Sequence, residues 1–198
     1  MLRADSEAGV IRITWSSGLG TLGSARGNSP GTLIVATQER KIWPTSESLH
    51  IVPWPRNERG ALTGLKTTSY AENVLALETA HRHDCDEALF LNTTGVLCEG
   101  TGTNIFLVIN EELVTPPISS GCLAGITREL VLEIAEVTER DISPSELDNC
   151  REAFITSSTR DLSPVSRFDD LSVPLVPGPV TEKIAQAFGR LKSSQPDP

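Results

Sequence analysis

Lysine is scarce in this chain of 198 residues, and one lysine lies in a setting that could do chemistry. Lys66 lies in a segment, residues 64–70, of small, apolar or hydroxylated residues, and the next charged residue is Glu72. Partial burial there would disfavour the ammonium form, and the free amine could act as a base or as a Schiff-base nucleophile. The alternative is an ordinary lysine ahead of a helix. The others, Lys41, Lys183 and Lys192, are interpreted as surface charges.

Glu99 is a second candidate, because it lies between an apolar segment and a turn rich in glycine and threonine. The sequence there is LCEGTGTNIF, residues 97–106. A carboxylate at such a boundary either faces solvent or points into a cavity as a fixed negative charge. Both alternatives stay open on the residues alone.

Two further segments have the composition of a phosphate site. Residues 125–129 (GITRE) open a predicted helix, where free N–H groups and the positive end of the helix dipole favour an anion. Residues 156–159 (TSST) form a hydroxyl cluster after a predicted strand and could complete such a site. The alternatives are an ordinary threonine cap for the first segment and a polar turn for the second.

Two other polar features point to no site. Residues 81–86 (HRHDCD) contain metal-ligating side chains, but they follow a predicted helix end and lack distant partners, so no metal site is predicted. Gly18, Gly20 and Gly23 lack the spacing and the preceding strand of a dinucleotide fingerprint.

Charge and hydropathy exclude several classes of function. The net charge is −9, from 17 basic and 26 acidic residues, which disfavours nucleic-acid binding because a phosphate backbone requires a basic face. No apolar run reaches the ~20 residues that span a bilayer, and the first residues lack a signal core. We therefore predict no membrane contact and a cytoplasmic location. The cysteines are predicted to be reduced and mostly buried; they are Cys85, Cys98, Cys122 and Cys150.

Hydrophobic patterning predicts hairpins of strands with helices between them. The predicted strands cover residues 10–15, 32–36, 49–52, 88–91, 96–98, 104–109, 112–115 and 154–156. The strand at 32–36 is predicted to be buried. The predicted helices cover residues 70–81, 127–139 and 179–191, and the first carries a stripe of Tyr70, Val74, Leu77 and His81. Strands that arrive in hairpins favour an α+β fold over a doubly wound parallel sheet.

Four of these segments resemble, in order, the motifs of the class IV, fold-type IV pyridoxal-phosphate enzymes. They are the lysine segment GLKTTSYAENV (64–74), the strand and turn EGTGTNIF (99–106), the helix start LAGITR (123–128) and the late strand FITSSTRDLSPV (154–165). The similarity extends from about Arg12 to Leu191. It implies the large C-terminal domain of the D-amino-acid-aminotransferase-like fold, with a hairpin-rich sheet or pseudo-barrel and packed helices.

The resemblance implies pyridoxal 5'-phosphate as the cofactor and gives three residues roles on its ring. Lys66 would carry the cofactor as a Schiff base and act as the catalytic base. Glu99 would lie against the pyridine nitrogen and keep it protonated, so that the ring accepts electrons from the substrate. Tyr70 would hydrogen-bond the phenolic oxygen.

The resemblance also implies a phosphate site. Backbone N–H groups of Ile126 and Thr127 would hold the phosphate at a helix N-terminus. Ser158 and Thr159 would add hydroxyl or backbone donors. No metal is expected.

The family has a smaller N-terminal domain that carries a phosphate-binding arginine and part of the substrate pocket. The chain begins where that domain would end. Residues 1–9 are therefore predicted as a residual linker, 10–192 as the cofactor-binding domain and 193–198 as a frayed tail. No residue here is expected to replace that arginine, so the chain is expected to be a fragment or a protein with a weaker hold on the cofactor.

The reaction is less strongly encoded than the cofactor. Residues 52–60 (VPWPRNERG) look most like bacterial sequences called aminodeoxychorismate lyase, which implies elimination of pyruvate to give 4-aminobenzoate in folate biosynthesis. The alternatives are a branched-chain or D-amino-acid aminotransferase of class IV, and a truncated, non-catalytic remnant. As partners, the family implies a small-molecule amino substrate and a second copy of the chain in a homodimer.

Overall fold

The computed structural model describes residues 9–194. The predicted linker lies outside these residues except for Gly9, and the predicted tail lies outside them except for Ser193 and Ser194, which are helical. The chain divides into two compact units, Met1–Trp43 and Pro44–Pro198. The sequence analysis did not predict a boundary at Trp43, and its own boundaries stay predictions. Within residues 9–194, each helix is too short or too polar to span a bilayer.

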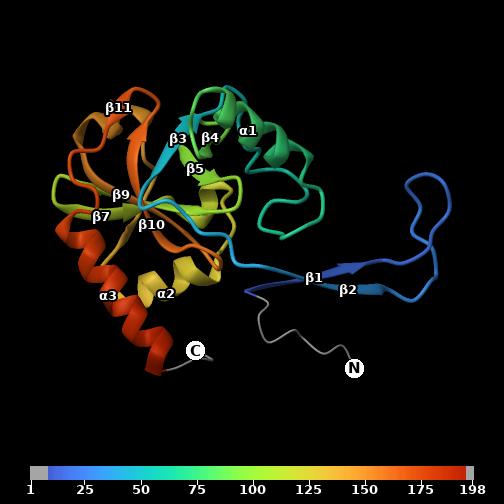
Figure 1. Ribbon diagram of the computed structural model, residues 1–198. Helices are drawn as coiled ribbons and strands as arrows, with labels where there is room; N and C mark the ends of the chain where they lie inside the picture. Colours follow the sequence, from blue (N-terminus) through green and yellow to red (C-terminus); the bar gives the residue numbers. More distant parts are fainter. Residues whose placement is uncertain (1–8, 195–198) are drawn as a thin grey trace. The chain divides into compact units, whose positions relative to one another are not determined.

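The first unit contains an antiparallel hairpin of strands β1 (Val10–Ser16) and β2 (Thr32–Gln38) (Figure 1). Both strands form where predicted, because β-branched and apolar residues favour an extended backbone. The prediction that residues 32–36 are buried is wrong, since Leu33 and Ile34 are more than half exposed. In the described part of this unit β2 pairs with β1 alone, so its apolar pattern does not mark a covered layer.

The second unit is built around one mixed sheet. Its strands are β3 (Glu47–Ile51), β4 (Glu87–Leu91), β5 (Leu97–Gly100), β6 (Asn104–Ile109), β7 (Glu112–Thr115), β8 (Thr138–Glu139), β9 (Cys150–Ser157), β10 (Asp161–Phe168) and β11 (Leu171–Ser172). The order is β5-β4-β3-β10-β9-β6-β7-β8, with β11 beside β10. β3 runs parallel to β4 and β10, and β7 runs parallel to β8, whereas the other neighbours are antiparallel.

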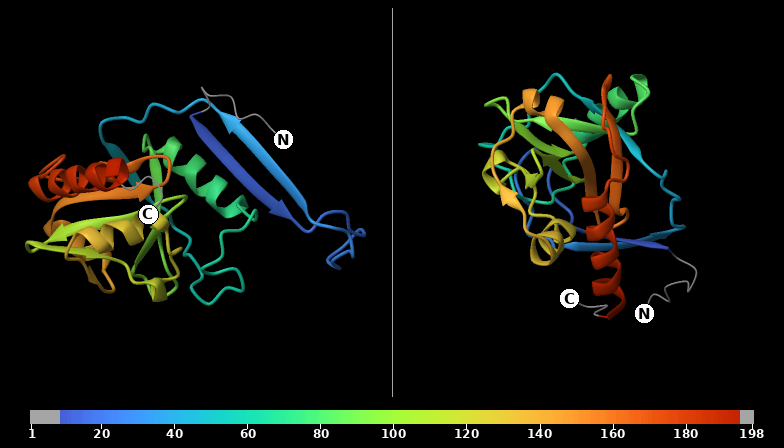
Figure 2. Two further views of the ribbon diagram at one scale, coloured as in Figure 1. Left: turned by 90° about the horizontal axis from the view of Figure 1, so that it is seen from below. Right: turned by 90° about the vertical axis from the view of Figure 1, so that its left-hand side faces the viewer.

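This sheet curls on itself. β5 and β6 are joined by the short turn at residues 101–103 and contact each other, yet they stand at opposite ends of the run β5-β4-β3-β10-β9-β6. A run of strands whose ends meet is barrel-like, and Figure 2 shows the curved sheet from two further sides. The predicted α+β pseudo-barrel is therefore confirmed.

Two hairpins form at the predicted turns. Between β4 and β5, the side chain of Asn92 accepts the N–H groups of Thr94 and Val96. Between β6 and β7, Asn110 and Glu111 have φ angles of 51° and 68°, the left-handed conformation that a two-residue hairpin turn requires. These turns set the register of the strands that carry the site.

Helices α1 (Ala71–Arg82), α2 (Ile126–Ile134) and α3 (Pro179–Ser194) pack against this sheet, with short 3-10 helices at Ile118–Ser120 and Pro144–Asn149. α1 contacts β3 and β4, whereas α2 and α3 contact each other and β9 (Figure 2). The predicted stripe on α1 is not its buried face. That face consists of Ala76 and Ala80, while Val74 is 61% exposed, because small residues let the helix approach β4 closely.

The second helix is shorter than predicted. It ends at Ile134, and Thr138 and Glu139 instead pair with β7 as strand β8. The β-branched Val137 and Thr138 favour that extended backbone once an open strand edge lies beside them. The sequence analysis also missed β10, because Pro164 argues against a strand.

The core consists of three clusters in the second unit. Strand residues alternate between them, so that Leu89 faces the interior of the curled sheet while Ala88 and Phe90 face α1. The third cluster joins Phe106 and Phe154 to α2 and α3, and the two rings stack at 4.9 Å. The strands whose ends carry the site are thus held on both faces.

Candidate active site

The second unit contains a cavity of about 650 Å³ at the ends of several of these elements. It brings together residues that are far apart in the sequence and that the sequence analysis singled out, namely Lys66, Tyr70, Glu99, Ile126, Thr127 and Ser158. Thr159 does not line the cavity. Its hydroxyl lies 3.4 Å from that of Ser157, within the turn between β9 and β10.

Lys66 and Tyr70 lie at the mouth of this cavity. Lys66 Nζ donates a hydrogen bond to Tyr70 Oη over 3.3 Å. The expectation that Lys66 is partly buried is wrong for this chain, because its loop ahead of α1 is exposed and neighbouring Leu65 is 62% exposed. The amine is therefore accessible to a molecule that enters the cavity.

Glu99 lies inside the cavity, which favours the second of its two alternatives. Its side chain is 14% exposed. Oε2 accepts the backbone N–H of Leu123 at 2.9 Å, and Oε1 lies 3.5 Å from Nε of Arg56. Burial raises the pKa of this carboxyl above its ordinary value, while the Leu123 N–H, Arg56 and Lys66 oppose that rise. The fold thus holds an acid whose ionisation depends on neighbouring cations.

Arg56 is a residue of this site that the sequence analysis missed. Its guanidinium lies 4.0 Å from the ring centre of Phe90 and donates to Glu72 at 2.7 Å and to Asn73 at 3.1 Å. It therefore ties the start of α1 to Glu99. In the sequence it stands in a loop between Pro55 and Asn57, and nothing local distinguishes it from a surface arginine.

The loop before α2 is held against Glu99 by a tight backbone packing. Asn104 donates from Nδ2 to the carbonyl of Leu123 at 2.8 Å. A Cβ on Gly125 would lie only 2.2 Å from Asn104 Oδ1, so only glycine fits there. The GITR segment and the EGxxxNxF turn thus depend on each other, which their separate positions in the sequence do not reveal.

The N-terminus of α2 opens into the cavity without a side-chain cap. Gly125 is the N-cap residue and forms no capping hydrogen bond, so the predicted alternative of a threonine cap is not what the structure has. Ile126 and Thr127 line the cavity at the end of the helix where free N–H groups and the dipole favour an anion.

Arg128 completes the GITR segment but contributes no charge to the cavity. Its buried guanidinium donates to the carbonyl of Pro116 at 2.9 Å and pairs with Glu139 of β8. Arg128 therefore anchors α2 to the sheet. Among residues 9–194, no group of three or more metal-ligating side chains forms a candidate metal site.

Comparisons with known proteins agree with this geometry. The family model "Amino-transferase class IV" matches residues 1–168. A "Probable branched-chain-amino-acid aminotransferase" of Synechocystis is 34% identical over 144 residues, which are 69% of this chain and 47% of that protein. The branched-chain-amino-acid aminotransferase of Escherichia coli K12 is 35% identical over 126 residues, 61% of this chain and 41% of that protein. The chain thus spans about half the length of the curated relatives it matches.

Solved structures with the same architecture carry several names. A Legionella pneumophila protein described as a "Putative 4-amino-4-deoxychorismate lyase" is 27% identical with a TM-score of 0.86, over 91% of this chain and 69% of that one. The branched-chain aminotransferase of Thermobaculum terrenum, solved in its PLP form, is 27% identical with a TM-score of 0.83, over 93% and 65%. The matches imply pyridoxal phosphate as the family's cofactor. This chain therefore belongs to the class IV aminotransferase family.

Proposed function

We propose that this chain is the cofactor-binding part of a pyridoxal-phosphate enzyme in which Lys66 binds the cofactor covalently. One cavity lined by a lysine amine, a buried carboxylate and an uncapped helix N-terminus carries the proposal. The cofactor has an aldehyde, a ring nitrogen and a phosphate, and the cavity offers one partner for each of these groups. When bound, it supplies an electron sink for charge that develops at the substrate's Cα.

Glu99 is the residue that would hold a proton on the ring nitrogen. A carboxylate does so only if it stays ionised and correctly oriented. The Leu123 N–H fixes the orientation of Oε2, and Arg56 beside Oε1 opposes the rise in pKa that burial causes.

The phosphate would be bound by the N–H groups of Ile126 and Thr127, with Ser158 on the neighbouring turn. Helix N-termini bind phosphates because their first N–H groups lack partners within the helix. Thr159 is not part of this proposal, since it does not line the cavity.

Lys66 is the residue that would move protons. Its amine at the mouth of the cavity can take the proton from the substrate's reacting carbon and return it elsewhere. The hydrogen bond to Tyr70 Oη keeps the amine on the side of the cavity where that carbon would lie.

For the reaction, we propose the lyase, in which 4-amino-4-deoxychorismate gives 4-aminobenzoate and pyruvate. The block VPWPRNERG at residues 52–60 and the match to the Legionella structure support it. Lys66 would remove the ring hydrogen and return a proton to the departing enolpyruvyl carbon. The second candidate is amino transfer, and the curated branched-chain aminotransferases at 34–35% identity support it.

Cofactor binding is tested by visible absorption of the purified chain with added pyridoxal phosphate, beside Lys66→Ala and the matched control Lys183→Ala. We expect a band in the wild type and in the control but not in Lys66→Ala, and attachment to Lys66 after borohydride reduction. A wild-type chain without the band, or a band that persists in Lys66→Ala, would contradict the proposal.

The two reactions are distinguished by their products. A chain extended by the family's N-terminal domain is assayed with 4-amino-4-deoxychorismate for pyruvate and 4-aminobenzoate, and with branched-chain amino acids plus 2-oxoglutarate for glutamate. Formation of 4-aminobenzoate without glutamate supports the lyase, and the reverse supports the aminotransferase.

We further propose that the whole enzyme is a homodimer, as the family resemblance implies. Exposed apolar side chains around the cavity, Leu62, Leu65 and Ile126, support a covering surface there. Sedimentation equilibrium of the extended chain should give twice the mass of one chain.

A further inference from the structure

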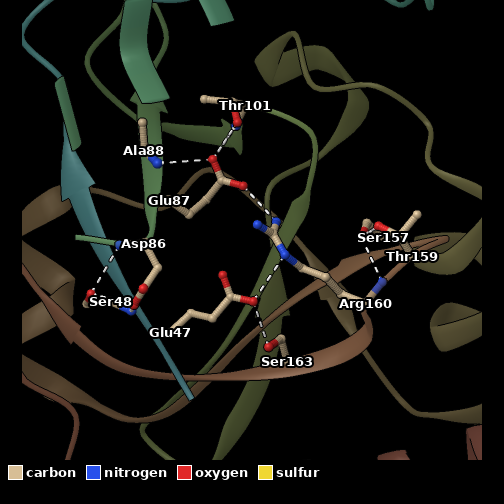
Figure 3. A network of polar contacts seen from close by, with 10 residues as sticks. All are labelled: Glu47, Ser48, Asp86, Glu87, Ala88, Thr101, Ser157, Thr159, Arg160 and Ser163. Atoms are coloured by element: carbon tan, nitrogen blue, oxygen red, sulfur yellow. Dashed lines mark hydrogen bonds and ion pairs between the residues drawn. The ribbon is translucent and has the colours of Figure 1, made fainter. Parts of the chain in front are cut away.

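A buried arginine lies beside the active-site cavity between two buried glutamates (Figure 3). Arg160 follows β9, Glu47 begins β3 and Glu87 begins β4. Arg160 Nε lies 3.1 Å from Glu47 Oε1, and Nη1 lies 2.7 Å from Glu87 Oε2. The carboxylate side chains are 1% and 2% exposed, and the arginine side chain is 9% exposed.

This cluster is an expensive way to fill space. Each buried charge loses hydration worth several kcal/mol, of the order that only good pairing and hydrogen bonding offset. Here two carboxylates share one guanidinium. Burial raises the pKa of Glu47, while Arg160 and the hydroxyl of Ser163 oppose that rise. Apolar residues would stabilise the same position at lower cost, so the cluster calls for a role other than stability.

On one side, the cluster reaches the cavity through the turn after β5. Glu87 Oε1 accepts the backbone N–H of Thr101 at 3.2 Å, and it also accepts the hydroxyl of Thr101. The carbonyl of Thr101 in turn accepts the side-chain amide of Asn73 from α1. Both Thr101 and Asn73 line the cavity.

On its other side, the cluster reaches the hydroxyl turn after β9. The backbone N–H of Arg160 donates to Ser157 Oγ at 3.2 Å, and Ser157 and Ser158 line the cavity. Figure 3 shows this turn and the Thr101 turn on different sides of the Arg160 guanidinium. One side chain thus connects two walls of the site.

We propose that Arg160 is a positioning residue that, through Glu87, fixes the distance between the Thr101 turn and the Ser157–Ser158 turn and so shapes the phosphate end of the cavity. The inference rests on the proposed function, because it concerns how the cavity takes the phosphate of the cofactor. The guanidinium acts on the phosphate through the two turns rather than as its counter-charge, since it lies between the carboxylates.

The test compares Arg160→Lys with the matched control Arg167→Lys, whose arginine bonds the carbonyl of Asp169 elsewhere on β10. Lysine has one point charge and cannot bridge two carboxylates as a guanidinium fork does. A second variant, Thr101→Val, removes the hydroxyl bond to Glu87 but keeps the charged cluster, so the proposal remains testable if Arg160→Lys does not fold.

The first measurement is the affinity for pyridoxal phosphate relative to that for pyridoxal, which lacks the phosphate. We expect Arg160→Lys to weaken binding of the phosphorylated form about tenfold, or about 1.4 kcal/mol, with a much smaller effect on pyridoxal. Thr101→Val should act in the same direction, and Arg167→Lys should change neither affinity. An equal loss for both ligands would indicate a merely structural role and overturn the proposal.

The second measurement needs no cofactor. Hydrogen exchange of the unliganded chain should accelerate in Arg160→Lys at both turns, residues 101–103 and 157–159. Acceleration at one turn alone, or at neither, would overturn the coupling. If the wild-type chain binds neither ligand, the proposed function fails, while this exchange measurement still decides whether Arg160 couples the two turns.

Discussion

Glu99 ties the stability of the chain to pH. Because burial raises its folded-state pKa above the ordinary value of 4.5, the folded chain keeps a proton that the unfolded chain releases. Its contribution is therefore fully present below pH 4.5 and is lost as pH rises through the raised pKa. Urea unfolding of wild type and Glu99→Gln across pH 4–8 measures this loss. The difference in unfolding free energy between the two should change over that window, and a constant difference would contradict the prediction.

Arg56 should matter most when Glu99 is ionised. Arg56→Gln removes the cation beside Oε1 and the bonds to Glu72 and Asn73, so we expect a loss of about 1–3 kcal/mol in unfolding free energy at neutral pH. The loss should shrink at pH 4–5, where Glu99 is protonated. The matched control is Arg59→Gln, whose side chain is 83% exposed and which should change stability little. Equal losses for the two variants would contradict the role given to Arg56.

Residues with unusual local contexts could be predicted from the sequence, whereas residues that act through distant partners could not. Lys66 and Glu99 stand out because charge is rare around them, and both line the cavity. Arg56 and Arg160 resemble surface arginines in the sequence. Their partners lie on other strands and on α1, so only the fold reveals them.

At the scale of elements, the start of α2 depends on the absence of a side chain at residue 125. Gly125→Ala would place a methyl group 2.2 Å from Asn104 Oδ1 and displace the amide that holds Leu123. We expect a loss of about 1–3 kcal/mol in unfolding free energy and weaker binding of pyridoxal phosphate. Differential scanning calorimetry and cofactor titration measure the two effects.

The matched control lies on α3. A Cβ on Gly189 meets nothing within 4 Å, so Gly189→Ala should stabilise the helix by about 0.5–1 kcal/mol. Destabilisation by both substitutions would show that the effect at residue 125 is not specific to the contact with Asn104.

Elements defined by their own sequence could be predicted, and elements defined by a neighbour could not. The turn of Asn110 and Glu111 specifies its hairpin locally, and that prediction is confirmed. β8 forms because the edge of β7 is open to it, and it shortens the predicted helix. The buried face of α1 consists of Ala76 and Ala80, which a search for large apolar residues passes over.

At the scale of the whole molecule, the three core clusters lie entirely within Pro44–Pro198. We therefore expect a chain that begins at Pro44 to fold by itself, with a cooperative urea transition and native near-ultraviolet circular dichroism. Residues 1–43 alone should not fold, because an isolated two-stranded hairpin is at best marginally stable in water. A non-cooperative transition in the shorter chain would contradict the assignment of the core to this unit.

The curled sheet keeps the four cysteines apart from water and from disulfide partners. All four are free and buried, and burial raises the pKa of Cys150 to about 12. Cys85, Cys98 and Cys122 lie in the cluster beneath α1, whereas Cys150 lies in the cluster inside the sheet. An alkylating reagent can therefore react only when a cluster opens. The unlabelled natural chain thus contains its own reporters of local opening, and peptide mapping of the alkylated thiols would tell which side of the sheet loosens first.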